Sequence, residues 1–172
     1  MEVYEALRPT NHNQDGQHVM STEETPTAPR YDGPRSLATA HSGFRLLRGA
    51  EARFHREGLR ADSEYRDLGL AEATGGRIGV KHIRGIGPFE QPTGWHWHDM
   101  HAHFVYVLRG WITFRFEGVE GDVTLHPGDS LSQPGGVPHN VIARSDDFEV
   151  LELNLPAAYG TFDLEPARGA AR

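Results

Sequence analysis

The chain has 172 residues, which is the length of one domain or of one domain with an additional arm, and this argues against two full-sized domains. Its 17 basic and 24 acidic side chains give a net charge of −7, so the chain has no general electrostatic attraction to nucleic acid or to an anionic membrane. The absence of cysteine excludes disulfides and thiolate metal sites, and 20 glycines with 11 prolines predict short elements joined by many turns.

The cellular location is suggested by what the sequence lacks. The first residues, Met1 to Glu5, are acidic and have no apolar region of the kind found in a secretory signal. No later stretch approaches the roughly eighteen apolar residues of a membrane-spanning helix. We therefore expect a cytoplasmic protein that binds neither nucleic acid nor a membrane.

Composition divides the chain into four parts. Residues 1–45 are polar and proline-rich, with almost no apolar periodicity, and predict a flexible N-terminal arm. Residues 46–64 form a short connecting segment, in which a turn or two of helix over 50–57 is one option. A β-barrel is predicted over 65–160 and a C-terminal tail over 161–172.

The barrel region alternates apolar and polar residues in short runs that are separated by glycine, proline and other turn residues. No long helix is credible there. Many short strands without helices are typical of an all-β fold, namely a β-barrel, jelly roll or sandwich. The predicted strands are 66–70, 77–84, 95–98, 103–108, 111–116, 123–125, 130–133, 137–142 and 148–155.

Four of the eleven histidines fall between residues 96 and 103. Side chains alternate between the faces of a strand, so His96 and His98 share one face. A tight turn at Asp99-Met100 would return the next strand antiparallel and bring His103 opposite this pair. The pattern thus predicts three imidazoles converging on one point.

Two segments of this region have a recognisable spacing. The first reads His96, one residue, His98, four residues, His103, six residues, Gly110. The second reads Gly128, five residues, Pro134, one residue, Gly136, two residues, His139. Together they resemble the paired motifs of the cupin superfamily over about residues 65–155.

The resemblance implies a small conical cupin or jelly-roll β-barrel with an irregular N-terminal arm, holding one divalent metal ion. The implied metal ligands are His96, His98, His103 and His139. Two positions depart from the family pattern, since His103 stands where cupins usually carry Glu and Ala143 stands where they carry Asn.

The departure at His103 bears on the metal. Four neutral imidazoles leave a divalent ion with its full formal charge, which makes it a stronger Lewis acid than an ion with a Glu ligand. Imidazole suits Fe, Mn, Ni, Cu and Zn better than Mg or Ca, and the ligand set does not select among these five metals.

Two alternatives concern the same residues. His101 competes with His103 as third ligand, although the spacing to Gly110 favours His103 and leaves His101 beside the site. Gln133 is a further candidate for the pocket. The four histidines would also fit a hydrogen-bonded network, without metal, inside a barrel that binds an organic ligand.

Large aromatic residues alternate with the predicted ligands. Trp95, Trp97, Phe104 and Tyr106 would point outward on one sheet if the histidines point inward. Either the residues before 65 or a second subunit would cover so much apolar surface, and we expect a homodimer through this outer sheet.

The function we expect is that of a metal-binding cupin acting on a small organic molecule, with a dioxygenase-type oxidoreductase as the leading reaction class. The motifs place no Asp or Glu at the site, so they identify no catalytic residue and no general base. A non-catalytic ligand-binding or regulatory module is the alternative, and an isomerase or epimerase is a weaker one.

Overall fold

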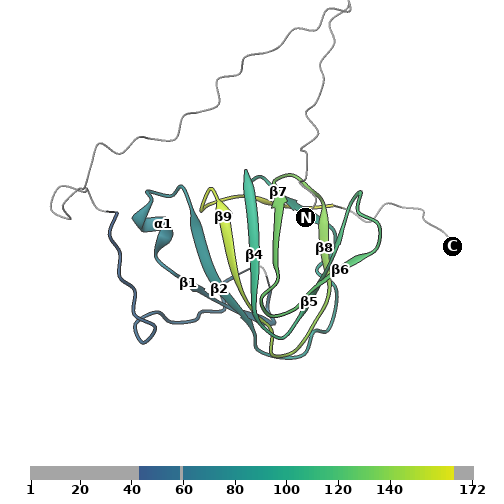
Figure 1. Ribbon diagram of the computed structural model, residues 1–172, viewed down its shortest axis with the longest axis horizontal. Helices are drawn as coiled ribbons and strands as arrows, with labels where there is room; N and C mark the ends of the chain where they lie inside the picture. The colour runs from purple at the N-terminus through teal and green to yellow at the C-terminus, as the bar shows by residue number, and fades with distance from the viewer. Residues whose placement is uncertain (1–42, 59, 165–172) are drawn as a thin grey trace, which may run out of the picture. The chain divides into compact units, whose positions relative to one another are not determined.

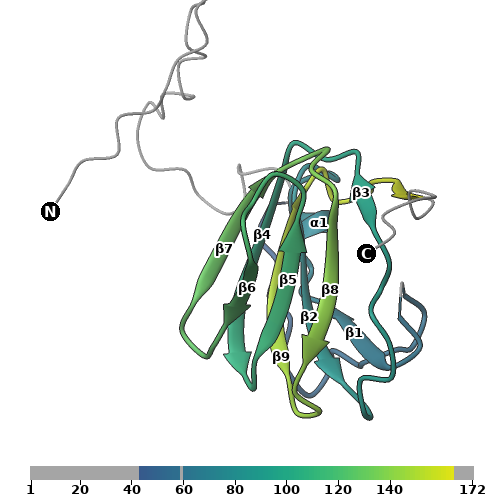
Figure 2. The ribbon, with the colours of Figure 1, turned by 90° about the vertical axis from the view of Figure 1, so that its right-hand side faces the viewer.

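The computed structural model describes residues 43–58 and 60–164. Two five-stranded antiparallel sheets make up this region, in the orders β1-β2-β9-β4-β7 and β10-β3-β8-β5-β6. Figure 1 looks onto the first sheet, and Figure 2 shows the second sheet with the first behind it. The elements are β1 (Ser63–Asp67), α1 (Leu70–Ala73), β2 (Gly79–Gly85), β3 (His96–His98), β4 (Ala102–Arg109), β5 (Ile112–Phe116), β6 (Asp122–Leu125), β7 (Ser130–Pro134), β8 (His139–Arg144), β9 (Glu149–Leu155) and β10 (Thr161–Asp163).

The all-β class expected from the sequence is confirmed, and the architecture is that of a jelly-roll barrel. No helix in the described part of the chain is long and apolar enough to cross a bilayer. Eight of the nine predicted strands overlap observed strands over most of their length. The ninth, at 66–70, is wrong at its end because Leu70 begins helix α1.

Residues 46–58 contain turns and an extended stretch instead of the helix considered over 50–57. His55 forms an antiparallel bridge with Tyr65, which holds this segment extended beside β1. The predicted arm at 1–45 lies outside the described residues except for its last three. The predicted tail at 161–172 instead begins with a strand, β10, which pairs with β3.

The chain crosses from one sheet to the other between β3 and β4. His103 on β4 therefore faces β3 across the barrel, and the predicted antiparallel pairing of these two strands is wrong. The same crossing corrects the expectation of four aromatics on one outer sheet. Trp97 lies on β3, where it stacks on Phe162, and Trp95 directly precedes this strand. Phe104 and Tyr106 lie on β4 in the other sheet.

The interior has an apolar part and a polar part. The apolar part is a cluster of buried side chains, of which Val107, Val141 and Phe148 are at most 2 % exposed. Inward positions near one end of the same strands instead carry His103 on β4 and Asn154 on β9, which are paired in register. This polar end is where the functional site lies.

Candidate metal centre

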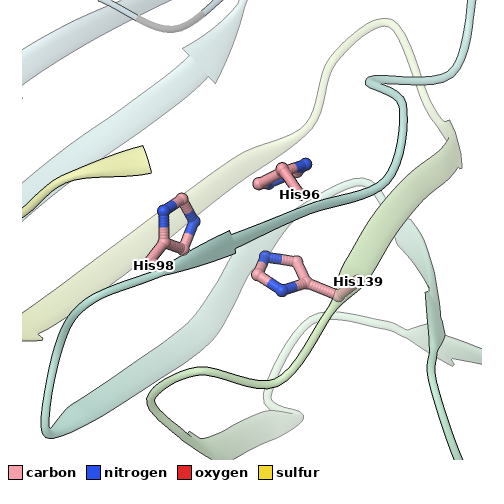
Figure 3. A group of neighbouring side chains, drawn as sticks. All are labelled: His96, His98 and His139. Atoms are coloured by element: carbon pink, nitrogen blue, oxygen red, sulfur yellow. The ribbon is translucent and has the colours of Figure 1, made fainter. Parts of the chain in front are cut away.

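Three histidines meet between strands β3 and β8. His96 and His98 project from the same face of β3, and His139 begins β8, where its Cα is paired with that of His96. The ring centroids are 4.5 Å apart for His96 and His139 and 5.1 Å apart for the other two pairs. One ligand nitrogen of each ring lies within 4.8 Å of the others. Figure 3 shows the three side chains grouped between the two strands.

Local backbone fixes the orientation of two of these rings. Nδ1 of His96 lies 2.9 Å from the carbonyl oxygen of Gly94, and Nδ1 of His139 lies 2.9 Å from that of Val137. A carbonyl oxygen only accepts, so each Nδ1 carries the proton and donates. In the neutral ring Nε2 then keeps its lone pair, which is the atom that a metal ion requires.

His98 is held from another strand. Its Nδ1 lies 2.9 Å from Oγ1 of Thr161 on β10, a hydroxyl that can accept the Nδ1 proton. The Tyr159 ring lies edge-on to His98, with centroids 5.2 Å apart. The strand that the sequence did not predict therefore supplies part of the support for the site.

The three rings are neutral at ordinary pH. Burial lowers the pKa of His98 to about 4 and that of His139 to about 3, and neighbouring histidines contribute in the same direction. Burial also lowers the pKa of His96. Since metal binding needs unprotonated imidazole, these shifts prepare the cluster for a cation.

His103 is buried beside the other three rings, with centroids 5.6 Å from His98 and 6.1 Å from His139. Neither of its ring nitrogens has a hydrogen-bond partner among the described residues. Its Nε2 lies 3.3 Å from Oε2 of Glu152, a contact of opposite polarity whose angles are not those of a hydrogen bond. An unsatisfied buried imidazole is costly unless it meets a ligand, a metal ion or water.

The two other candidates lie differently. His101 is exposed and does not line the cavity, so the structure brings His103 and not His101 to the cluster. Gln133 is buried next to the cluster, where its Cα is paired with that of His103 and its Nε2 lies 3.4 Å from Nδ1 of His139.

Sequence reasoning missed two polar groups of the site, Glu152 and Tyr159. Glu152 points inward from β9 toward His103, and the Tyr159 hydroxyl lies 3.4 Å from Oε1 of Glu152. Burial alone would raise the pKa of Glu152, but the His103 contact and the charges of Lys81 and Arg60 outweigh it and lower that pKa. Burial and the Glu152 charge raise the pKa of Tyr159, so the phenol keeps its proton.

A cavity of about 760 Å³ opens beside these groups and is lined by all four histidines together with Glu152. Its volume lies in the range of pockets for small organic molecules. The remaining wall is mixed, and its apolar part includes Val105, Ile112 and Phe114. The cavity thus combines a cluster of ligand nitrogens with a hydrophobic surface.

Residues 86–154 match the sequence model of the family described as Cupin domain. The chain contains a cupin domain. The match spans both motifs of the cupin domain and seven of its ten strands, β3 to β9, in whole or in part. No curated protein sequence matches the chain.

Solved structures with the same fold are distant in sequence. The polyketide cyclase RemF from Streptomyces resistomycificus is 16 % identical, with a TM-score of 0.57 over 73 % of this chain and 88 % of its own. A sugar phosphate isomerase of the cupin superfamily from Silicibacter pomeroyi is 21 % identical, with a TM-score of 0.50 over 64 % and 71 %. FeII HppE is 15 % identical, with a TM-score of 0.52 over 66 % and 60 %.

Proposed function

We propose that this cupin domain is a metal-dependent enzyme that transforms a small organic molecule in its barrel cavity. The observation that carries the proposal is the buried cluster of His96, His98 and His139, whose Nδ1 atoms are held and whose Nε2 atoms are left for a cation. The half-buried acid beside the cluster, Glu152, favours catalysis over binding alone.

The donor set fits a transition metal. Three neutral imidazoles would hold it, and His103 would be the fourth ligand, since its ring is buried beside His98 and His139 and makes no hydrogen bond among the described residues. A bound Fe, Mn, Ni, Cu or Zn ion supplies Lewis acidity, and redox chemistry where the metal allows it. The residues do not fit Mg or Ca, which prefer oxygen ligands.

Glu152 and Tyr159 are the groups that would handle protons. The Glu152 carboxylate faces the cavity and is available as a base toward a substrate lying against the cluster. The Tyr159 phenol keeps its proton and can donate a hydrogen bond to a substrate oxygen. The apolar wall would exclude water from the reacting atoms.

Within this class we propose a dioxygenase-type oxidoreductase. An imidazole set suits iron, and one of the fold relatives, FeII HppE, is named for its iron(II) form. A second candidate is an isomerase or epimerase, because Tyr159 lies against His98 and next to Glu152, an arrangement that could move protons without a metal. A regulatory ligand-binding module would need neither Tyr159 nor Glu152 as a proton-transferring group.

Elemental analysis of untagged protein purified without chelator tests the proposal. We expect about one equivalent of transition metal in the wild type, its loss in His139→Ala, and weaker retention in His103→Ala. His101→Ala is the matched control and should keep the metal. A wild-type protein without metal, even after anaerobic reconstitution with Fe²⁺, would contradict the metal-dependent function and favour the isomerase or the binding module.

Other expectations stay predictions. These are the cytoplasmic location, a small molecule rather than nucleic acid or a membrane as partner, and the homodimer. For the homodimer, the exposed side chains Tyr106 and Leu108 on the outer face of β4 make this the sheet that we propose for the contact.

A further inference from the structure

Arg60 places a cation at the wall of the cavity. It is half-buried and lines the same cavity as the histidine cluster. Among the described residues its guanidinium makes no ion pair and no hydrogen bond, although its backbone N–H donates to the Tyr65 hydroxyl at 3.0 Å. The guanidinium is therefore available to an acceptor that a ligand brings into the cavity.

The backbone segment that carries Arg60 is anchored to the barrel on both sides of this residue. Arg144, buried in the barrel, donates to the Asp62 carboxylate at 2.8 Å and to the Asp62 carbonyl oxygen at 3.1 Å. Ile86 donates its backbone N–H to the same carbonyl at 3.0 Å. The ring of Tyr65 packs so closely against Gly58 that a Cβ at this glycine would overlap it.

The charge balance of the described cavity lining leaves Arg60 unmatched. Lys81 and Glu152 are Cα partners on β2 and β9 and both line the cavity, so their charges offset each other. Asp62 is paired with Arg144. The remaining acids of the lining, Glu57, Glu90 and Asp163, have exposed side chains that water can solvate. The unmatched charge in the less exposed part of the cavity is therefore positive.

The surroundings of Arg60 indicate what kind of anion would complete the site. Arg60 lines the same cavity as His96, His98 and Glu152, so an anion held by it would share the cavity with the cluster. The same cavity lining includes the apolar side chains of Ile83, Val105, Ile112, Phe114, Phe148 and Val150. A ligand that satisfies both features carries one anionic group on an apolar body.

We propose that Arg60 binds the carboxylate of the substrate, and that the substrate class is a small carboxylic acid with an apolar body. The planar fork of a single guanidinium matches a carboxylate, with two parallel hydrogen bonds. A phosphate dianion would need further donors, and neither a helix N-terminus nor a second unpaired arginine lines the cavity in the described part of the chain. This assignment deepens the proposed function and rests on it.

Calorimetry on chelator-treated protein tests the assignment separately from the metal. The probes are acetate, pyruvate, benzoate and phenylacetate, each compared with its neutral amide, and phenyl phosphate as the alternative anion. We expect at least one acid to bind about tenfold or more tightly than its amide, and this preference to vanish in Arg60→Gln. Arg77→Gln removes the same charge from an exposed position outside the cavity and should change nothing.

Three results would overturn the assignment: no binding by any of the acids, equal binding of acid and amide, or equal preference in Arg60→Gln. Tighter binding of phenyl phosphate would replace the carboxylate by a phosphate. Thermal unfolding without ligand distinguishes a ligand-binding role of Arg60 from a purely structural one. If Arg60 binds a ligand, the melting temperature of Arg60→Gln should be unchanged or raised, because the substitution removes an unpaired charge. A clear drop would mean that Arg60 serves the fold. Acid binding that depends on Arg60, in a wild-type protein that takes up no metal even after reconstitution, would refute the metal-dependent function alone.

Discussion

The ion pair between Arg144 and Asp62 is the contact whose loss we expect to be most damaging outside the histidine cluster. The Arg144 side chain is fully buried. It donates to the backbone carbonyl oxygens of Ser145, Gly87 and Asp62 and to Oδ2 of the Asp62 carboxylate. Replacing it by Met keeps most of the volume but removes the charge and every donor. Breaking a buried pair from one side costs about 3 to 5 kcal/mol.

The structure favours the lower end of that range. The Asp62 side chain is 27 % exposed, so water can solvate part of the carboxylate that Arg144→Met leaves behind. We expect a loss of about 3 kcal/mol in the free energy of unfolding, which for a domain of this size is a fall of roughly 10 °C in melting temperature. Urea unfolding followed by tryptophan fluorescence measures the first quantity and calorimetry the second.

A matched pair on the surface supplies the control. Arg115 and Asp122 also make two hydrogen bonds, at 2.7 and 3.0 Å, but both side chains are exposed, and Arg115→Met should have little effect. In the double variant Arg144→Met/Asp62→Asn the second change should be much less harmful than Asp62→Asn alone. If Arg144→Met proves no more damaging than Arg115→Met, the reasoning from burial is wrong.

Three further predictions follow from the site and the outer sheet. Burial holds the pKa of His98 at about 4 and that of His139 at about 3, below the ordinary value of 6.5. Below pH 6.5 the unfolded metal-free chain therefore binds protons that the folded chain does not, and its stability falls as the pH drops toward 4. Calorimetry should find about 2 kcal/mol lost for each between about pH 7 and about pH 5, and a flat profile would contradict this. Thr161→Val removes the acceptor of His98 Nδ1 and should weaken metal binding about 10- to 100-fold in competition with a chelating dye, whereas unchanged affinity would show that the hydroxyl is dispensable. Light scattering should give a dimer mass for the wild type and a monomer mass for Tyr106→Glu, and a monomeric wild type would refute the homodimer.

Much of the histidine cluster could be predicted because it depends on local alternation. His96 and His98 share a face of β3 whatever the strand packs against. Glu152 could not be found this way, because the leucines between 151 and 155 mark the opposite face of β9 as the apolar one. The register instead pairs Leu151 with the exposed Tyr106 and Glu152 with the buried Val105. Ordinary hydrophobic patterning fails where the interior is polar.

Other features of the site depend on pairings between distant parts of the chain. Arg60 owes its place to the bond between Arg144 and Asp62, which are 82 residues apart. Strand β10 is only three residues long and exists through its pairing with β3 and the stacking of Phe162 on Trp97. No local propensity encodes such contacts, so composition alone describes these residues as a connector and a tail.

The carbonyl groups that hold His96 and His139 belong to Gly94 and Val137, each two residues earlier in the same segment. Each ligand therefore carries its own orienting acceptor within a three-residue peptide. Such a unit should be portable, since transplanting residues 94–98 and 137–139 onto two paired strands of another antiparallel sandwich would transfer the orientations of His96 and His139. The host would have to supply the register that pairs His96 with His139 and, from a third strand, an acceptor for His98 in place of Thr161.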